Sequence, residues 1–331
     1  MTYVVHLTVR LSGRLVVGKQ GGSGMSDISG GAPPRRWESP AVATWERRGR
    51  YDRFSGHEVF SLDIRASRSE IGEPLLILHG FPTSSFDFCH VVDELSRARR
   101  VLLLDLVGYG LSEKPDMAYT LDTQADIVTA FVTETGVRRL SLLTHDMGDT
   151  VGGELLARQA EGRFPAEVAR RVVTNGSIYI EMAQLSIGQQ ALLALPDERL
   201  AADSGVDATA VAEGLRATFS DPSRVPDEDV IAACELIVHD DGHLLLPRTI
   251  RYIEERRRYQ DRYTGAIEAH PSPLAIIWGT DDPIALKEMA ERLAQRRPEA
   301  SLEWLPGVGH YPMLEAPELF SASVERALGS S

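Results

Sequence analysis

The run Thr144-His145-Asp146-Met147-Gly148 constrains the fold of this chain more than any other segment. It follows a short apolar stretch, 140–143, that is typical of a buried strand, and it precedes a helical pattern over 150–160. A small–x–nucleophile–x–small pattern between strand and helix indicates a nucleophile elbow, with Asp146 at the tip and the small residue Gly148 after it. An aspartate carboxylate is ionised at neutral pH and attacks without a base to deprotonate it. The residue type therefore points to substrates with a strained or polarised carbon–heteroatom bond.

A second motif, His79-Gly80-Phe81-Pro82, follows the apolar stretch 74–78. Gly80 allows a sharp turn, after which the amide N–H of Phe81 would point at a bound oxyanion. The amide N–H of Met147 would supply the second donor of this oxyanion hole. We expect His79 at the floor of the pocket as a substrate-binding residue, or as a buried histidine whose hydrogen bonds shape the loop.

Two further motifs supply a candidate acid and a candidate histidine, and both follow Asp146 in the chain. The apolar stretch 274–279 leads into Asp281-Asp282, and 302–305 leads into Gly309-His310. The chain order is then Asp146, an acid at 281 or 282, and His310. This nucleophile–acid–histidine order is that of α/β-hydrolases and differs from the orders of the other triad folds.

With these motifs, the chain resembles the aspartate-nucleophile branch of the α/β-hydrolase superfamily over about residues 45–328. This branch contains epoxide hydrolases and haloalkane or haloacetate dehalogenases. Within it, segments 145–149, 175–176, 240–242 and 309–312 look most like the mesoderm-specific transcript proteins. The resemblance implies an α/β fold with a mostly parallel twisted sheet, flanking helices and an inserted helical cap. It also implies Asp146 as nucleophile, His310 as base and Asp282 as acid, with Asp281 in reserve, because the family's acid usually lies three residues after the glycine that ends its strand.

The order of strand and helix patterns predicts the domain organisation. Residues 1–42 are expected to be a disordered extension. In the alternative, translation starts at Met25 instead of Met1. Residues 43–175 and 268–331 would form the two parts of the α/β core. Residues 176–267, named the cap segment below, would be helical and would close the pocket at the carboxyl ends of the strands. Within this segment, Arg256-Arg257-Arg258 is interpreted as a solvated helix face, because acidic residues lie among the arginines.

Two chemistries compete for such a site, and both form an ester on Asp146 that water activated by His310 would hydrolyse. Halide release needs N–H donors, whereas Met147 and Phe81 have no donor in their side chains. An epoxide oxygen needs a proton donor, usually a cap tyrosine in this family, and we predict Tyr179 and Tyr263 for this role. Epoxide hydrolysis is therefore favoured over dehalogenation. A non-catalytic ligand-binding protein is a third alternative that the full catalytic set argues against, and the absence of a G-x-S-x-G run disfavours a serine esterase.

Composition excludes several other functions. The formal net charge of −13 disfavours binding to nucleic acid, and no apolar run reaches the length of a membrane span. The two cysteines, Cys89 and Cys234, form no disulfide framework and no metal-binding pattern. We therefore expect no cofactor and no metal, a small apolar organic substrate as the partner, and, without a signal-peptide pattern, a cytoplasmic location.

Overall fold

The computed structural model describes residues 37–68 and 70–329. Its centre is an eight-stranded sheet with the order β1-β2-β4-β3-β5-β6-β7-β8. The strands are β1 (Arg50–Phe54), β2 (His57–Ile64), β3 (Leu75–Leu78), β4 (Val101–Leu104), β5 (Arg139–His145), β6 (Glu167–Thr174), β7 (Leu274–Gly279) and β8 (Ser301–Leu305). β2 pairs antiparallel with both β1 and β4, and every pairing from β4 to β8 is parallel. This arrangement confirms the predicted α/β-hydrolase fold class.

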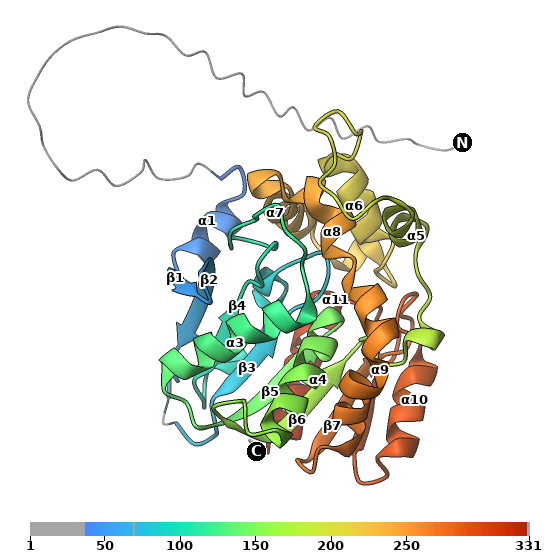
Figure 1. Ribbon diagram of the computed structural model, residues 1–331. Coiled ribbons are helices and arrows are strands. Elements are labelled where there is room, and N and C mark those ends of the chain that lie inside the picture. Colours follow the sequence, from blue (N-terminus) through green and yellow to red (C-terminus); the bar gives the residue numbers. More distant parts are fainter. Residues whose placement is uncertain (1–36, 69, 330–331) are drawn as a thin grey trace, which may run out of the picture. The chain divides into compact units, whose positions relative to one another are not determined.

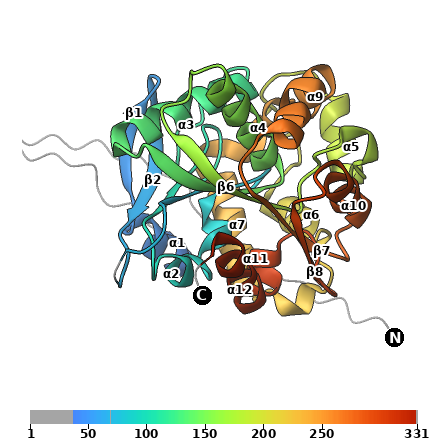
Figure 2. The ribbon, with the colours of Figure 1, turned by 90° about the horizontal axis from the view of Figure 1, so that it is seen from below.

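Helices cover both faces of the sheet (Figure 2). One face carries α3 (Leu121–Thr135), α4 (Met147–Ala160) and α9 (Tyr252–Ala269), and the other carries α2 (Val92–Leu95) and α12 (Pro317–Leu328). The shorter α1 (Pro40–Glu46) and α11 (Pro312–Glu315) and the helix α10 (Lys287–Arg296) complete the part outside the cap segment. Because helices cover both faces, β3, β4 and β7 are buried along their whole length and read as continuous apolar runs.

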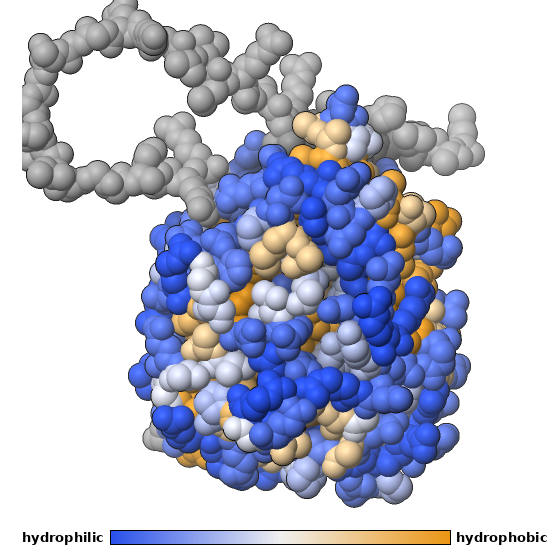
Figure 3. Space-filling view, viewed as in Figure 1, coloured by the Kyte–Doolittle hydropathy of each residue, from blue (hydrophilic) through white to orange (hydrophobic). Residues whose placement is uncertain are grey.

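The described chain between β6 and β7 is helical. It contains η2 (Ile180–Met182), α5 (Ile187–Ala194), α6 (Ala208–Arg216), η3 (Pro222–Arg224), α7 (Asp227–Val238), η4 (His239–Leu245), α8 (Leu246–Thr249) and α9. In Figure 1, α5 to α8 gather at one end of the molecule, and α9 runs back along α4. The face drawn in Figure 3 is mainly hydrophilic, with hydrophobic residues gathered at the edge over α5, where Ile187 is 88% exposed. Among the described residues, no helix combines the length and the apolar character that crossing a membrane requires.

The folded part begins before the predicted boundary at residue 42. Ser39 caps α1, and Val42 and Trp45 of this helix are buried. The backbone amides of Glu38 and Ser39 donate to the Glu235 carboxylate of α7, at 2.7 and 3.0 Å. Residues 37–42 therefore belong to the folded part, while the rest of the predicted extension lies outside the described residues.

The interpretation of the arginine run as a solvated face is wrong for its first member. Arg257 and Arg258 are exposed, but Arg256 is 1% exposed. Its Nε donates to Oγ1 of Thr150 at 2.7 Å, and its guanidinium lies 5.0 Å from the centre of the Tyr252 ring. Arg256 and Tyr252 both belong to α9, so their buried cation–π contact stabilises this helix, and the bond to Thr150 joins α9 to α4.

A polar cluster joins the cap segment to the core. The side chains of Cys89, His90 and Asp229 place one ligand-type atom each within 4.8 Å of one another, and Nε2 of His90 lies 2.7 Å from Oδ2 of Asp229. The sequence did not show this cluster, because Asp229 is distant from the other two residues along the chain. Hydrogen bonds to Asp229 and Cys89 raise the pKa of His90 to about 10. Because Nε2 of His90 and the Asp229 carboxylate lie within hydrogen-bond distance, we interpret the cluster as an ion pair between core and cap segment.

This ion pair makes stability depend on pH. The folded-state pKa of His90, about 10, exceeds the ordinary value of 6.5, so the contribution is complete below pH 6.5 and is lost as the pH rises through about 10. We expect His90→Gln to lower the melting temperature at pH below 6.5, and we expect the difference from the wild type to vanish above about pH 10. Asp229→Asn should show the same dependence. A difference that stays constant across this range would contradict the ion pair.

Candidate active site

Asp146 occupies the tight turn between β5 and α4. Its backbone has φ 50° and ψ −115°, a conformation that costs a non-glycine residue on the order of 1–3 kcal/mol. The turn packs closely against the end of β3, because a Cβ atom on Gly148 would lie 2.5 Å from the carbonyl oxygen of Leu78. The local geometry is therefore that of the predicted nucleophile elbow, with Asp146 at its tip.

The loop after β3 lies directly against the Asp146 side chain. A Cβ atom on Gly80 would come within 2.5 Å of Asp146 Cβ, so glycine is needed here for close approach. Gly80 does not have a positive φ, so the sharp turn expected at this residue is not the reason for glycine. The amide N–H of Phe81 donates to Oδ2 of Asp146 at 2.8 Å. The predicted oxyanion-hole donor thus already binds an oxygen of the carboxylate.

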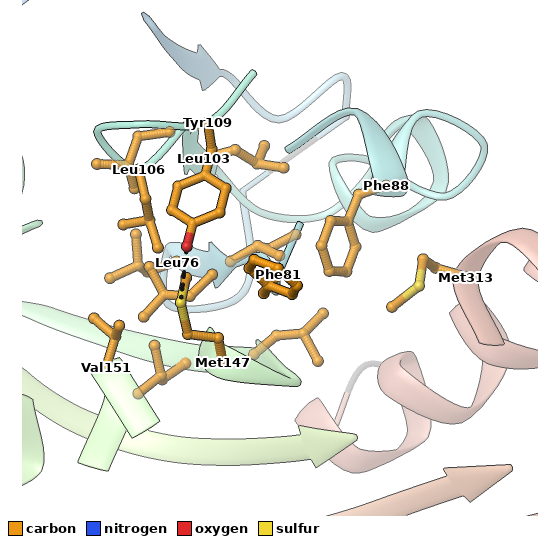
Figure 4. Packing of buried hydrophobic residues seen from close by; sticks show 14 of the residues in the cluster. Leu76, Phe81, Phe88, Leu103, Leu106, Tyr109, Met147, Val151 and Met313 are labelled. Atoms are coloured by element: carbon orange, nitrogen blue, oxygen red, sulfur yellow. Dashed lines mark hydrogen bonds between the residues drawn. The ribbon is translucent and has the colours of Figure 1, made fainter. Parts of the chain in front are cut away.

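Met147 presents its backbone and its side chain to different surroundings. As the first residue of α4, its amide belongs to the turn whose N–H groups have no carbonyl partner within the helix. Its side chain packs among buried apolar residues (Figure 4). The Tyr109 hydroxyl lies 3.4 Å from Sδ of Met147. The same hydroxyl donates to the carbonyl oxygen of Thr249 at 3.2 Å. Only the amide of Met147 is therefore a candidate donor at the site.

The structure pairs His310 with Asp282 and leaves Asp281 at the surface. Nδ1 of His310 lies 2.8 Å from Oδ2 of Asp282, and both residues are buried. Oδ1 of Asp282 accepts the backbone amides of Ile284 and Ala285, at 2.7 and 2.9 Å, which fixes the carboxylate. Asp281 is exposed and accepts a hydrogen bond from the Thr280 hydroxyl.

The charge of His310 depends on two carboxylates. Burial lowers the pKa of this imidazole, but Asp282 and then Asp146 outweigh burial and raise the pKa to about 9. The imidazole is therefore protonated at neutral pH. Because Asp146 contributes to the shift, neutralising Asp146 would lower the pKa of His310.

Three side chains that the sequence analysis did not assign hold the loop around His310. Nδ2 of Asn175 donates to Oδ2 of Asp282 at 2.8 Å and to the carbonyl oxygen of Gly309 at 3.2 Å. Nε2 of His145 lies 2.8 Å from the carbonyl oxygen of His310. Burial, followed by the nearby His310, lowers the pKa of His145 to about 4, so His145 is neutral and donates this bond. The Glu315 carboxylate accepts the backbone amides on both sides of His310.

Both ring nitrogens of His79 contact backbone atoms near its own loop. Nδ1 lies 2.9 Å from the carbonyl oxygen of Gly80, and Nε2 accepts the amide of Leu106 at 2.9 Å. Burial lowers the pKa of His79, which favours this neutral donor–acceptor arrangement. We therefore assign His79 to the alternative role, shaping the loop, in place of substrate binding.

The hydrogen bonds and ring contacts described for Tyr179 and Tyr263 are to residues outside the catalytic set. The Tyr179 hydroxyl donates to Oε1 of Glu268 at 2.7 Å, and the Tyr179 ring packs against the Arg292 guanidinium. Burial, followed by Glu255 and Glu154, raises the pKa of Tyr263, and the Tyr263 backbone packs against Gly153 of α4. These surroundings do not support the predicted substrate-binding roles of either tyrosine.

Tyr252 and Tyr311 lie nearer to Asp146. Both are buried, and the Asp146 carboxylate is among the charges that raise the pKa of each hydroxyl, after burial in both cases. The Tyr252 ring lies 5.7 Å from the Phe81 ring, and Tyr311 directly follows His310 in the chain. Tyr311 belongs to a motif that the sequence analysis quoted, whereas the sequence held no signal that would select Tyr252 from the cap tyrosines.

Comparisons with known proteins identify relatives of this chain. The family model described as "Alpha/beta hydrolase family" matches residues 75–323. The chain is 36% identical to the protein named "Putative hydrolase LipZ" of Mycobacterium tuberculosis, over 86% of this chain and 96% of that protein. It is 31% identical to the mesoderm-specific transcript protein of Mus musculus, over 84% and 85% of the two chains. A crystal structure of an α/β hydrolase fold protein from Burkholderia ambifaria superimposes with a TM-score of 0.68 at 25% identity, covering 83% of this chain and 96% of that one.

These matches confirm the resemblance at the level of the superfamily, and they include the elbow, the acid and the histidine within the matched residues. The chain belongs to the alpha/beta hydrolase family, and its activity is of the hydrolase type.

Proposed function

We propose that this protein hydrolyses a carbon–oxygen bond at an sp³ carbon through an ester on Asp146, with epoxides as the favoured substrates. The observation that carries the proposal is the bond from the Phe81 amide to Oδ2 of Asp146. In a serine hydrolase the oxyanion hole receives an oxygen of the substrate. Here it already contains an oxygen of the nucleophile, so Oδ1 is the atom that would attack carbon.

The same contact prepares the second step. Once Oδ1 is alkylated, Oδ2 becomes the carbonyl oxygen of the ester and remains in the oxyanion hole. Water attack on the Asp146 carbonyl carbon then places negative charge on Oδ2, where the Phe81 and Met147 amides stabilise it. One such donor contributes roughly 2.7–4 kcal/mol to stabilisation of the transition state.

Alkylation also prepares His310 to act as a base. The ester has no charge, so the Asp146 contribution to the raised pKa of His310 disappears when the ester forms. His310 then gives its proton to solvent and accepts one from the attacking water, while Asp282 stabilises the imidazolium. When Asp146 returns to its carboxylate form, His310 takes a proton back from solvent. His310 thus becomes a better base only after Asp146 has been alkylated, so hydrolysis of the ester follows its formation.

The leaving oxygen of an epoxide needs a hydroxyl donor close to Asp146. Tyr252 is buried beside Phe81 and belongs to α9, the helix that leads out of the cap segment. Met147 and Phe81 offer only apolar side chains for a halide. This difference favours an epoxide over an alkyl halide as the substrate.

The test compares leaving groups and tyrosines. We expect the protein to convert styrene oxide to its diol faster than it releases bromide from a bromoalkane of similar size. Tyr252→Phe should slow epoxide turnover on the order of 10²-fold, since it removes a donor to the developing charge. Tyr179→Phe and Tyr263→Phe are matched controls that should retain wild-type rates. If bromide is released faster than the diol is formed, dehalogenation becomes the favoured function. If Tyr263→Phe is slow, Tyr263 is the proton donor, as the sequence analysis predicted.

A further inference from the structure

A second buried aspartate lies close to the catalytic set without a role in the steps above. Asp87, in the short helix η1 (Ser85–Phe88), is 1% exposed. The Thr83 hydroxyl lies 2.5 Å from its Oδ2. Among the described residues, Oδ1 of Asp87 is buried and has no hydrogen-bond partner. Such an unpartnered buried oxygen is costly in a carboxylate and calls for an explanation.

Hydrogen bonds connect Asp87 to the residue that follows the catalytic histidine. Thr83 bonds to the Asp87 carboxyl group, and the hydroxyl of Tyr311 bonds to Thr83. Figure 4 shows Phe81, Phe88 of η1 and Met313 of α11 among the buried hydrophobic residues of this part of the core. The three groups form a continuous chain, Asp87–Thr83–Tyr311, from η1 toward the nucleophile.

The surroundings of Asp87 favour its neutral form. Burial raises the pKa of this carboxyl group well above its usual range, and the Asp105 and Asp146 carboxylates add to this, while Thr83 and His310 act in the opposite direction. A neutral carboxylic acid carries an O–H group that can donate to Thr83. The hydrogen bonds along the chain can then all point from Asp87 toward Tyr311.

We propose that Asp87, Thr83 and Tyr311 form a proton relay that protonates the leaving oxygen while Asp146 is alkylated. The relay rests on the proposed function. As the Asp146–carbon bond forms and the carbon–oxygen bond of the epoxide breaks, the electron pair goes to the leaving oxygen. That oxygen takes the Tyr311 proton, while the Tyr252 hydroxyl keeps its own proton and donates a hydrogen bond to the same oxygen. Tyr311 takes the Thr83 proton, and Thr83 takes the Asp87 proton, which leaves Asp87 as a carboxylate.

The second half of the reaction resets the relay. His310 takes a proton from the attacking water and returns it to the departing alcohol oxygen. Asp146 is then released as a carboxylic acid whose hydroxyl came from water. It gives its proton to the Asp87 carboxylate, so both groups regain their starting states and the net reaction is addition of one water to the epoxide. Burial keeps the Asp87 carboxylic acid protonated, so Asp87 can supply a proton in the first half of the reaction and take one back in the second.

The experiment compares two substrates that differ in what leaves. In a His310→Gln background, the rate of ester formation on Asp146 is measured by mass spectrometry with styrene oxide and with phenacyl bromide. Bromide leaves without a proton, whereas the epoxide oxygen requires one. Asp87→Asn keeps the size and polarity of the side chain but has no acidic proton. We expect it to lower the epoxide-to-bromide ratio of rates on the order of 10²-fold, and Tyr311→Phe should lower the same ratio.

The matched control is Asp149→Asn. Asp149 is another buried aspartate, whose pKa burial raises to about 8, but it bonds to Thr144 instead of the relay. Its replacement should leave the ratio unchanged, and melting curves identify variants that fail to fold. A ratio that Asp87→Asn and Tyr311→Phe leave unchanged would overturn the relay while the ester mechanism stands. If neither reagent labels Asp146 in the His310→Gln parent, the proposed function fails, and the relay fails with it.

Discussion

Replacement of Asp146 by alanine should abolish turnover while the protein stays folded. Both proposed steps pass through this carboxylate, so we expect a loss on the order of 10⁴-fold or more. Alanine keeps the backbone of the elbow, and the deleted carboxylate is buried beside Phe81. We therefore expect the free energy of unfolding to change by less than about 2 kcal/mol. Turnover of styrene oxide and a thermal melt measure the two quantities.

Asp281→Ala is the matched control for this variant, because it removes an exposed aspartate close to the His310 loop. It should retain wild-type turnover, whereas Asp282→Ala should not, because Asp282 holds Nδ1 of His310. Substantial turnover by Asp146→Ala would show that another group attacks the substrate.

Replacement of His310 by glutamine should separate the two halves of the reaction. Alkylation needs no base, so Asp146 should still react once. Hydrolysis of the ester needs a base for water, and its loss should slow this step by about 10²- to 10⁴-fold. Rapid-mixing experiments should then show a burst of substrate consumption equal to one equivalent of enzyme, followed by almost no turnover.

The control for the burst is His90→Gln, which removes a histidine of the core–cap ion pair outside the site. It should show no burst and should turn over steadily at pH values where it is folded. Steady turnover at the wild-type rate by His310→Gln would contradict the role of His310 as base.

The order of nucleophile, acid and histidine could be predicted from the sequence, because each motif consists of residue types that its local geometry requires. The elbow at Asp146 and the glycine at 80 follow from close packing at the ends of neighbouring strands, which leaves a mark on the residue types. The choice between Asp281 and Asp282 needed the family pattern, since either side chain could have followed β7. The structure separates them by burial and by the bond to His310.

The positions of the tyrosines could not be read in this way. α9 contains a non-helical residue, Tyr259, at φ −122° and ψ 27°, so a helical period counted from one end does not hold at the other. Tyr252 and Tyr263 consequently have different surroundings within one helix. The sequence analysis did not identify Asp87 and Arg256 as buried ionisable residues, for a related reason. Charged residues are usually exposed, and only tertiary packing shows that these two are not.

The most direct test of the account is to locate the covalent bond. His310→Gln would be mixed with styrene oxide, digested at low pH and examined by peptide mass spectrometry. The account predicts one added substrate mass on the peptide that contains Asp146, at the Asp146 side chain, and no such adduct in the Asp146→Ala, His310→Gln double variant. An adduct on another residue, or diol formation without any adduct on Asp146, would contradict the central claim that this carboxylate is the nucleophile.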